Sequence, residues 1–245
     1  MQYMTTKSIK SRFRLPNYTI REILRGLLVP KFCPIHEQSA ETHYSRLCHK
    51  CMLDLRSFHQ ACLFCSRPHI VGQVCQSCRQ GGAIIGSLSL VRLNDLGRNI
   101  LWHSKFYGNI EYLDDLLLLY KQTVDEWFQH YVSDGYEFIF VPEAGDSLRL
   151  RGYHHNQYLR RYLQRRYGLK FNNSLAMAKH IRQTGKSRLQ RIDMRSEIYL
   201  LRPLRSEKIV IIDDVFTTGQ TMRNIATILK ESGAKKVVGI SMFRK

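Results

Sequence analysis

The fold of this chain follows from one stretch near its C-terminus, Val210-Ile211-Ile212-Asp213-Asp214-Val215-Phe216-Thr217-Thr218-Gly219-Gln220-Thr221-Met222-Arg223. The apolar residues from 208 to 212 predict a buried strand that ends in two adjacent carboxylates. Hydroxyl side chains and one glycine follow and predict a short loop. The spacing of the apolar residues beyond the loop predicts a helix from about residue 220 to residue 231. We therefore expect a strand, a loop and a helix in direct succession.

The loop has the chemistry of a phosphate site. Backbone N–H groups and hydroxyls at a helix N-terminus favour an anion, and Gly219 lets the backbone approach a ligand closely. Asp213 and Asp214 could accept hydrogen bonds from two vicinal sugar hydroxyls, and we expect both to face solvent at the end of the strand. The alternative is an ordinary strand whose turn caps a helix. The complete run favours a phosphorylated sugar.

The run D-D-V-F-T-T-G-Q-T resembles the 5-phosphoribosyl-1-pyrophosphate (PRPP) signature of type I phosphoribosyltransferases. In that family the two acids hold the ribose 2- and 3-hydroxyls, and the loop surrounds the 5-phosphate. The resemblance implies that Asp213 and Asp214 bind ribose here. It also implies a phosphate cradle made of Thr217, Thr218, Gly219, Gln220 and Thr221.

The composition is that of a folded but very basic protein. The 245 residues include 44% hydrophobic and 11% aromatic residues, enough for one α/β domain with a small appendage. The 38 Lys and Arg outnumber the 20 Asp and Glu, which gives a net charge of +18. Such an excess favours polyanionic partners. The sequence shows neither a membrane-spanning run nor a secretory signal, so we expect a cytoplasmic protein.

Most of the excess charge lies between residues 147 and 205, where fifteen Lys or Arg face only two acids. Tyr, His and Phe residues alternate with these basic residues, a mixture typical of sites for single-stranded nucleic acid. The alternative is a solvated helix face with some Tyr in the core, which the i, i+4 spacing of Tyr158 and Tyr162 also fits. We predict DNA contacts from Arg160, Arg161, Arg165 and Arg166.

All seven cysteines lie between residues 33 and 78, and six of them form C-x-x-C pairs. Without an export signal, this spacing favours zinc over disulfides. A C-x-x-H pair at Cys33 and His36 has the same spacing, although His43 and His49 are alternative ligands. Four pairs fit two structural tetrahedral sites, and cross-braced pairing stays open. The sequential assignment is Cys33, His36, Cys48 and Cys51 for one ion, then Cys62, Cys65, Cys75 and Cys78 for the other.

The composition changes after Gly82, and strand and helix patterns then alternate. Strands are predicted over residues 84–93, 136–141 and 235–242, and helices over 113–127 and 157–167. Alternation of this kind predicts a parallel sheet with helices on both faces and a site at the strands' C-terminal ends. We expect a basic N-terminal segment (1–31), a zinc module (32–82) and a phosphoribosyltransferase-like domain (83–245).

Paired cysteines followed by a PRPP loop resemble the ComF family of late-competence proteins. Besides the PRPP loop, four stretches carry the resemblance: His103-Ser104-Lys105-Phe106-Tyr107-Gly108-Asn109, Phe140-Val141-Pro142, Arg151-Gly152-Tyr153-His154-His155-Asn156-Gln157, and Gln183-Thr184-Gly185-Lys186-Ser187-Arg188-Leu189-Gln190-Arg191.

The resemblance implies a role in natural transformation, in which the protein handles single-stranded DNA beside a DNA-translocating helicase. The alternative is an active phosphoribosyltransferase that transfers phosphoribose from PRPP to a nucleobase. In such an enzyme Lys105 and Arg151 would neutralise the leaving pyrophosphate, and Mg²⁺ would bridge it to the ribose. A purine-responsive regulator is a third possibility, but the sequence has no helix-turn-helix pattern.

Overall fold

The computed structural model describes residues 33, 35–36, 46–56, 62, 75–76, 86–142, 155–177 and 198–245. At its centre lies strand β5 (Lys208–Phe216), whose residues 209 to 212 are fully buried. Four apolar residues with branched side chains in a row are typical of a strand that is covered on both faces. β5 is therefore an interior strand of a two-faced sheet.

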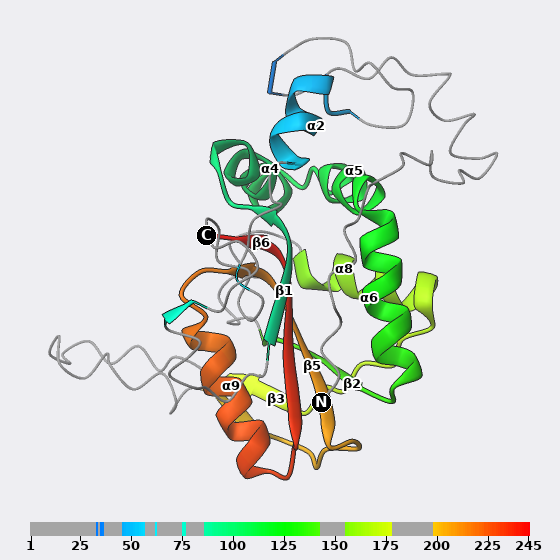
Figure 1. Ribbon diagram of the computed structural model, residues 1–245, viewed down its shortest axis with the longest axis vertical. Helices are drawn as coiled ribbons and strands as arrows, with labels where there is room; N and C mark the ends of the chain where they lie inside the picture. The colour runs from blue at the N-terminus through cyan, green and yellow to red at the C-terminus, as the bar shows by residue number, and fades with distance from the viewer. Residues whose placement is uncertain are drawn as a thin grey trace, which may run out of the picture.

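The main sheet has four strands in the order β1-β6-β5-β2, and every neighbouring pair is parallel (Figure 1). The other strands are β1 (Gly86–Arg92), β6 (Lys236–Arg244) and β2 (Glu137–Phe140). A parallel bridge between Phe138 and Phe171 continues the sheet beyond β2. This confirms the predicted α/β fold with a parallel sheet.

Side chains from β5 alternate between two cores. Val210 and Ile212 belong to a core with Phe138 and Phe140 of β2, whereas Ile209 and Ile211 belong to a second core on the opposite face. This alternation is the two-residue period of a strand. Because both faces are apolar, helices have to cover both.

In the part of the chain that the structure describes, four helices pack into the first core and one packs into the second (Figure 1). The four are α4 (Asp95–Phe106), α5 (Glu111–Leu119), α6 (Lys121–Ser133) and α8 (His155–Tyr167). On the other face α9 (Gln220–Glu231) buries Met222, Ile225, Ala226 and Leu229. The prediction of helices on both faces is thereby confirmed.

Two smaller features complete the described part of the chain. Strands β3 (Leu175–Met177) and β4 (Ile198–Leu200) form an antiparallel pair that packs with α9 through Leu175 and Ile198. Helix α2 (His49–Arg56) lies against the α4–α5 layer, and its Cys51 and Leu55 belong to the same core as that layer (Figure 1). None of these three elements was predicted from sequence.

The predicted helix over 113–127 is wrong in one respect, because the chain forms two helices there. Tyr120 leaves helical geometry with φ of −104° and ψ of 19°, which ends α5 and begins α6. Its hydroxyl donates a hydrogen bond to the carbonyl of Leu55 in α2. No helix in the described ranges has both the length and the hydrophobicity needed to cross a bilayer.

Candidate functional site

The two acids of the signature lie within strand β5 and not beyond it. β5 continues to Phe216, and its pairing with β6 sets Asp213 opposite Ser241 and Phe216 opposite Arg244. The expectation that both carboxylates face solvent is wrong for Asp214, whose side chain is only 13% exposed. The longer strand explains the difference, because strand pairing keeps this part of the chain within the sheet.

Lys105 comes from the last turn of α4 and forms an ion pair with the carboxylate of Asp214. The two side chains are 18% and 13% exposed, so solvent screens this pair only in part. Lys105 and the acid pair were predicted separately as site residues, and the fold brings them together. Arg151, the other predicted catalytic residue, lies outside the described residues.

Asp213 lies in a less polar environment. It lines a small apolar cavity together with Ile212, Ile240 and Met242. Burial raises the pKa of the Asp213 carboxyl well above its usual value, and the neighbouring charge of Asp214 raises it further. Lys105 acts in the opposite direction. Two adjacent carboxylates in such a place favour a ligand that supplies hydrogen-bond donors or positive charge.

The loop after β5 contains the residues that the sequence assigned to a phosphate cradle, and that role stays a prediction. Thr217 and Thr218 are exposed, and α9 begins immediately after them at Gln220. Gly219 has a left-handed φ of 75°, and a Cβ atom at this position would clash with the ring of Phe216. Glycine is therefore required here for two reasons. The loop lies at the N-terminus of a twelve-residue helix, where an anion is favoured. The N–H of Gln220 donates to the hydroxyl of Thr218 over 3.3 Å.

Arg244, the penultimate residue of the chain as given, lies next to this loop and donates hydrogen bonds to its backbone carbonyls. No motif pointed to it. Its position in the strand paired with β5 is the signal that could have found it.

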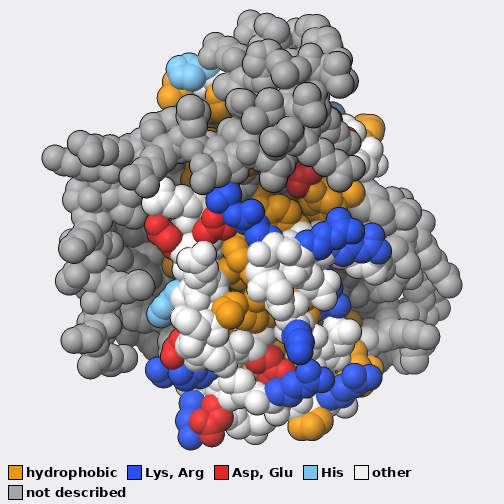
Figure 2. Space-filling view, turned by 90° about the vertical axis from the view of Figure 1, so that its right-hand side faces the viewer, with side chains coloured by type: hydrophobic (Ala, Val, Ile, Leu, Met, Phe, Trp, Pro, Cys, Tyr) orange, Lys and Arg blue, Asp and Glu red, His pale blue; other side chains and the backbone are white. Residues whose placement is uncertain are grey.

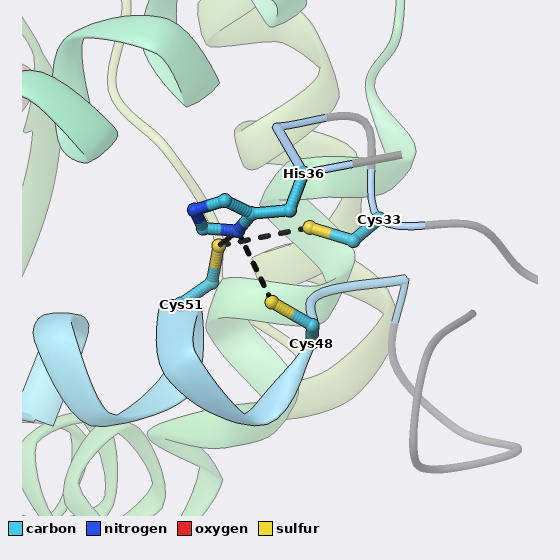
Figure 3. A group of neighbouring side chains, drawn as sticks. All are labelled: Cys33, His36, Cys48 and Cys51. Carbon is cyan, nitrogen blue, oxygen red and sulfur yellow. Dashed lines mark hydrogen bonds between the residues drawn. The ribbon is translucent and has the colours of Figure 1, made fainter. Parts of the chain in front are cut away.

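The first predicted zinc site is a compact group of Cys33, His36, Cys48 and Cys51, whose ligand atoms all lie within 4.8 Å of one another. Figure 3 shows the four side chains pointing toward a common centre. His36 Nδ1 lies 3.2 Å from Cys48 Sγ and 3.3 Å from Cys51 Sγ, and the sulfurs of Cys33 and Cys51 are 3.6 Å apart. Zinc–sulfur bonds of about 2.3 Å in a tetrahedron set sulfurs about 3.8 Å apart. The four residues therefore fit one zinc ion.

The pKa values of two thiols in this group, Cys33 and Cys51, shift in opposite directions. Burial opposes ionisation of Cys33, but hydrogen bonds from backbone N–H groups and from the Cys51 thiol lower its pKa to about 7. Burial raises the pKa of Cys51, as do the neighbouring sulfurs of Cys33 and Cys48. A divalent cation would remove this repulsion, because thiolates are the form that binds zinc.

The structure describes half of the second predicted zinc site. Cys62 and Cys75 are buried, and the N–H of Cys75 donates to Cys62 Sγ over 3.3 Å. The remaining two ligands, Cys65 and Cys78, lie outside the described residues, so this site stays a prediction.

The four arginines predicted to bind DNA all lie on α8 but differ in their surroundings. Arg160 is half-buried over the rings of Phe140 and Phe171, with its guanidinium carbon 5.3 Å from each ring centre. Arg166 forms a two-bond ion pair with Asp125, with both distances 2.9 Å. Arg161 and Arg165 are exposed one helical turn apart.

Arg161, Arg165 and Arg166 line a surface hollow together with Tyr158 and Tyr162. The hydroxyl of Tyr158 donates to Asp114 of α5. Figure 2 shows Lys and Arg side chains spread over the side of the molecule formed by α6 and α8, with Asp and Glu side chains among them. The basic residues of this segment between positions 178 and 197 lie outside the described residues.

Comparison with known proteins adds three findings. Residues 159–245 match the phosphoribosyl transferase domain family. The competence protein ComFC of Bacillus subtilis is 24% identical over 210 residues, which cover 81% of this chain and 82% of the relative. ComFC of Streptococcus pneumoniae is 24% identical over 150 residues, which cover 52% of this chain and 66%, just under two thirds, of that protein. Taken with the parallel sheet and the Cys/His cluster, these matches support a phosphoribosyltransferase-like protein that is similar to the ComF family.

Proposed function

We propose that this protein is a DNA-handling factor for natural transformation that carries a PRPP-type ribose-phosphate pocket. The two ComFC relatives are competence proteins by name and support a competence-related role. One observation gives the main support for the proposed pocket. An acid pair and a glycine loop lie in sequence at the C-terminal end of the central strand, where ligands of parallel α/β sheets bind.

Each part of a phosphorylated ribose has a counterpart in this site. The carboxylates of Asp213 and Asp214 accept hydrogen bonds from the two ring hydroxyls. The 5-phosphate occupies the loop from Thr217 to Thr221 at the start of α9. The ammonium of Lys105, which forms an ion pair with Asp214, binds a pyrophosphate on the neighbouring carbon.

Single-stranded DNA binds through the basic segment between residues 147 and 205. Arg161 and Arg165 are the described side chains best placed to neutralise phosphates, because they are exposed on one face of α8. Arg160 and Arg166 support that face through their contacts with Phe171 and Asp125. The partner that delivers the strand is a DNA-translocating helicase, and both proteins work in the cytoplasm.

The proposal includes the domain organisation and both metals. A basic segment (1–31) precedes a zinc module (32–82) with two structural ions, and the phosphoribosyltransferase-like domain follows (83–245). The module supplies stability and not chemistry, because four protein ligands leave no coordination position open. Mg²⁺ accompanies PRPP into the pocket, where it adds positive charge near the two carboxylates.

A second candidate is a working phosphoribosyltransferase. It is favoured by the position of Lys105, a cation already held at the carboxylates that would bind the ribose. In that reaction the bond from the anomeric carbon to pyrophosphate breaks and a nucleobase nitrogen takes its place. Lys105 and Arg151 would stabilise the departing charge, so that catalysis is mostly electrostatic and positional.

Binding of PRPP with Mg²⁺ and of a fluorescent single-stranded oligonucleotide, measured separately and together on the full chain, tests the proposal. We expect both to bind. If PRPP does not bind, the assignment of the ribose-phosphate pocket is wrong. If the oligonucleotide does not bind at moderate salt, the proposed DNA role is wrong. Release of pyrophosphate when a nucleobase is added with PRPP would favour the second candidate.

A further inference from the structure

Arg244 is a charged side chain in an unexpected place. It lies at the C-terminal end of β6, opposite Phe216 of β5 on one side and Arg92 of β1 on the other. Only 2% of its surface is exposed. A buried arginine requires specific partners, because an uncompensated charge is costly to remove from water.

The guanidinium of Arg244 finds its partners in the proposed phosphate loop. Its Nη1 donates to the carbonyl of Phe216 over 2.8 Å and also to the carbonyl of Thr217. Its carbon lies 4.6 Å from the centre of the Phe216 ring, which adds a cation–π contact. The ring beneath the guanidinium is the same one that excludes a side chain at Gly219. One residue therefore fixes both the backbone and the packing of the loop.

A second arginine contacts the next carbonyl of the loop. Arg223, in the first turn of α9, donates from Nη2 to the carbonyl of Thr218 over 2.7 Å. Three consecutive carbonyls, of residues 216, 217 and 218, therefore accept hydrogen bonds from arginines. The carbonyl of Phe216 also accepts from the backbone N–H of Lys245 over 3.0 Å. In a trans peptide unit the N–H points away from the C=O. The N–H groups of Thr217, Thr218 and Gly219 consequently point away from the arginines that hold those carbonyls, as amides of an anion-binding nest do.

The charge of Arg244 adds to this orientation. The guanidinium lies beneath the loop and is shielded from solvent, so its field at the loop is weakened less than that of a surface charge. The guanidinium of Arg244 contacts the carbonyls of Phe216 and Thr217, so we assign it no direct contact with the phosphate.

We propose that Arg244 is a positioning residue for the 5-phosphate: it turns the amides of the 217–219 loop toward the ligand and supplies a buried positive charge behind them. This inference rests on the proposed ribose-phosphate pocket. It makes the affinity of the loop for phosphate depend on Arg244 of β6, which lies outside the signature from Asp213 to Thr221.

The test is calorimetric titration of ribose 5-phosphate against the wild-type chain and three variants, at a temperature well below the melting point of each. Arg244→Gln removes the charge and one of the two carbonyl contacts. Arg244→Lys keeps the charge but loses the planar group that stacks on Phe216. Arg92→Gln is the matched control, because Arg92 pairs with Arg244 across the sheet but is exposed.

We expect Arg92→Gln to bind as the wild type does, Arg244→Gln to bind at least tenfold more weakly, and Arg244→Lys to lie between them. The amide signals of residues 217–219 should also differ from wild type in Arg244→Gln before ligand is added. A merely structural role would lower the melting temperature and leave the affinity of the folded protein unchanged.

Equal affinity in Arg244→Gln and Arg92→Gln would overturn the inference and leave the pocket intact. If Arg244→Gln does not fold, wild-type affinity in Arg244→Lys would overturn it. A wild-type chain that binds no ribose 5-phosphate contradicts the pocket itself and the inference with it.

Discussion

Lys105 of α4 and Asp214 of β5 form an ion pair at the C-terminal end of the central strand. Asp213 precedes Asp214 and lines an apolar cavity. Among the described residues, Lys105 is a cation that pairs with Asp214 and also lowers the pKa of the Asp213 carboxyl.

Replacing Lys105 by Met should destabilise the ligand-free protein by about 1–3 kcal/mol, because the carboxylate of Asp214 would lose its partner in a poorly solvated place. The loss should be larger at pH 8 than at pH 5, because the raised pKa of the Asp213 carboxyl favours its protonation at the lower pH, which relieves its repulsion with Asp214. Urea denaturation at the two pH values measures it. Lys235→Met is the control, since its pair with Glu207 is mostly exposed and should contribute little. Equal losses in both variants would contradict the role given to Lys105.

Replacing Asp213 by Asn should stabilise the ligand-free protein at pH 7.5 by a few degrees in melting temperature. The raised pKa of the Asp213 carboxyl means that the folded state binds a proton more tightly than the unfolded state. Stability therefore falls as the pH rises from the unfolded pKa toward the folded pKa. Asn removes this dependence.

The gain in melting temperature from Asp213→Asn should vanish near pH 4, below which both states carry the proton. Comparing variant with wild type at each pH cancels the effect of acid on the zinc ligands. A variant that melts below the wild type at pH 7.5 would show that the Asp213 carboxylate stabilises the fold, contrary to its environment.

Metal content should be close to two zinc ions per chain in protein purified without chelator. Cys48→Ser or His36→Ala should lower it toward one, because each removes a ligand from the cluster. His36→Cys should keep the ion, since a thiolate can replace an imidazole at a tetrahedral zinc. His49→Ala is the control, an exposed neighbour in α2. Loss of zinc from His49→Ala and not from His36→Ala would reverse the ligand assignment.

Reversing two charges on α8, Arg161→Glu with Arg165→Glu, should weaken binding of single-stranded DNA and flatten its salt dependence. Each phosphate contact contributes about −0.7 to the slope of log K against log salt. Fluorescence anisotropy at several salt concentrations gives that slope. The matched control is Lys230→Glu with Lys236→Glu, two exposed lysines at the α9 end of the molecule. Equal effects of the two double variants would mean that DNA is attracted by the net charge of the protein and not by this face of α8.

Tyr158 on the same helix could either stack on a DNA base or pack within the protein. Tyr158 is half-buried and its hydroxyl donates to Asp114. These contacts favour the structural alternative that the i, i+4 spacing of Tyr158 and Tyr162 already suggested. The four arginines on α8 likewise could not be told apart from sequence. The sequence gives their charge, but it does not show that Arg160 packs on Phe171 and that Arg166 pairs with Asp125.

The fold was predictable from sequence where local patterns decide it. The helix at 220–231 was predicted with the bounds the structure gives, because Gly219 and a strongly amphipathic run mark them. The extension of β5 to Phe216 was not, since acids and a bulky aromatic residue weaken a strand pattern, and only pairing with β6 keeps them in the sheet. Lys105 came from resemblance, and its contact with Asp214 depends on the packing of α4 against the sheet.

The most direct test of the central claim is calorimetric titration of PRPP with Mg²⁺ against the wild-type chain and the double variant Asp213→Ala, Asp214→Ala. The control is Asp134→Ala with Glu207→Ala, which removes the same charge near the other end of β5. Melting temperature and zinc content show that each protein is folded. We predict saturable binding to the wild type and the control, and none to the double variant. Wild-type binding by the folded double variant would contradict the assignment of this pocket.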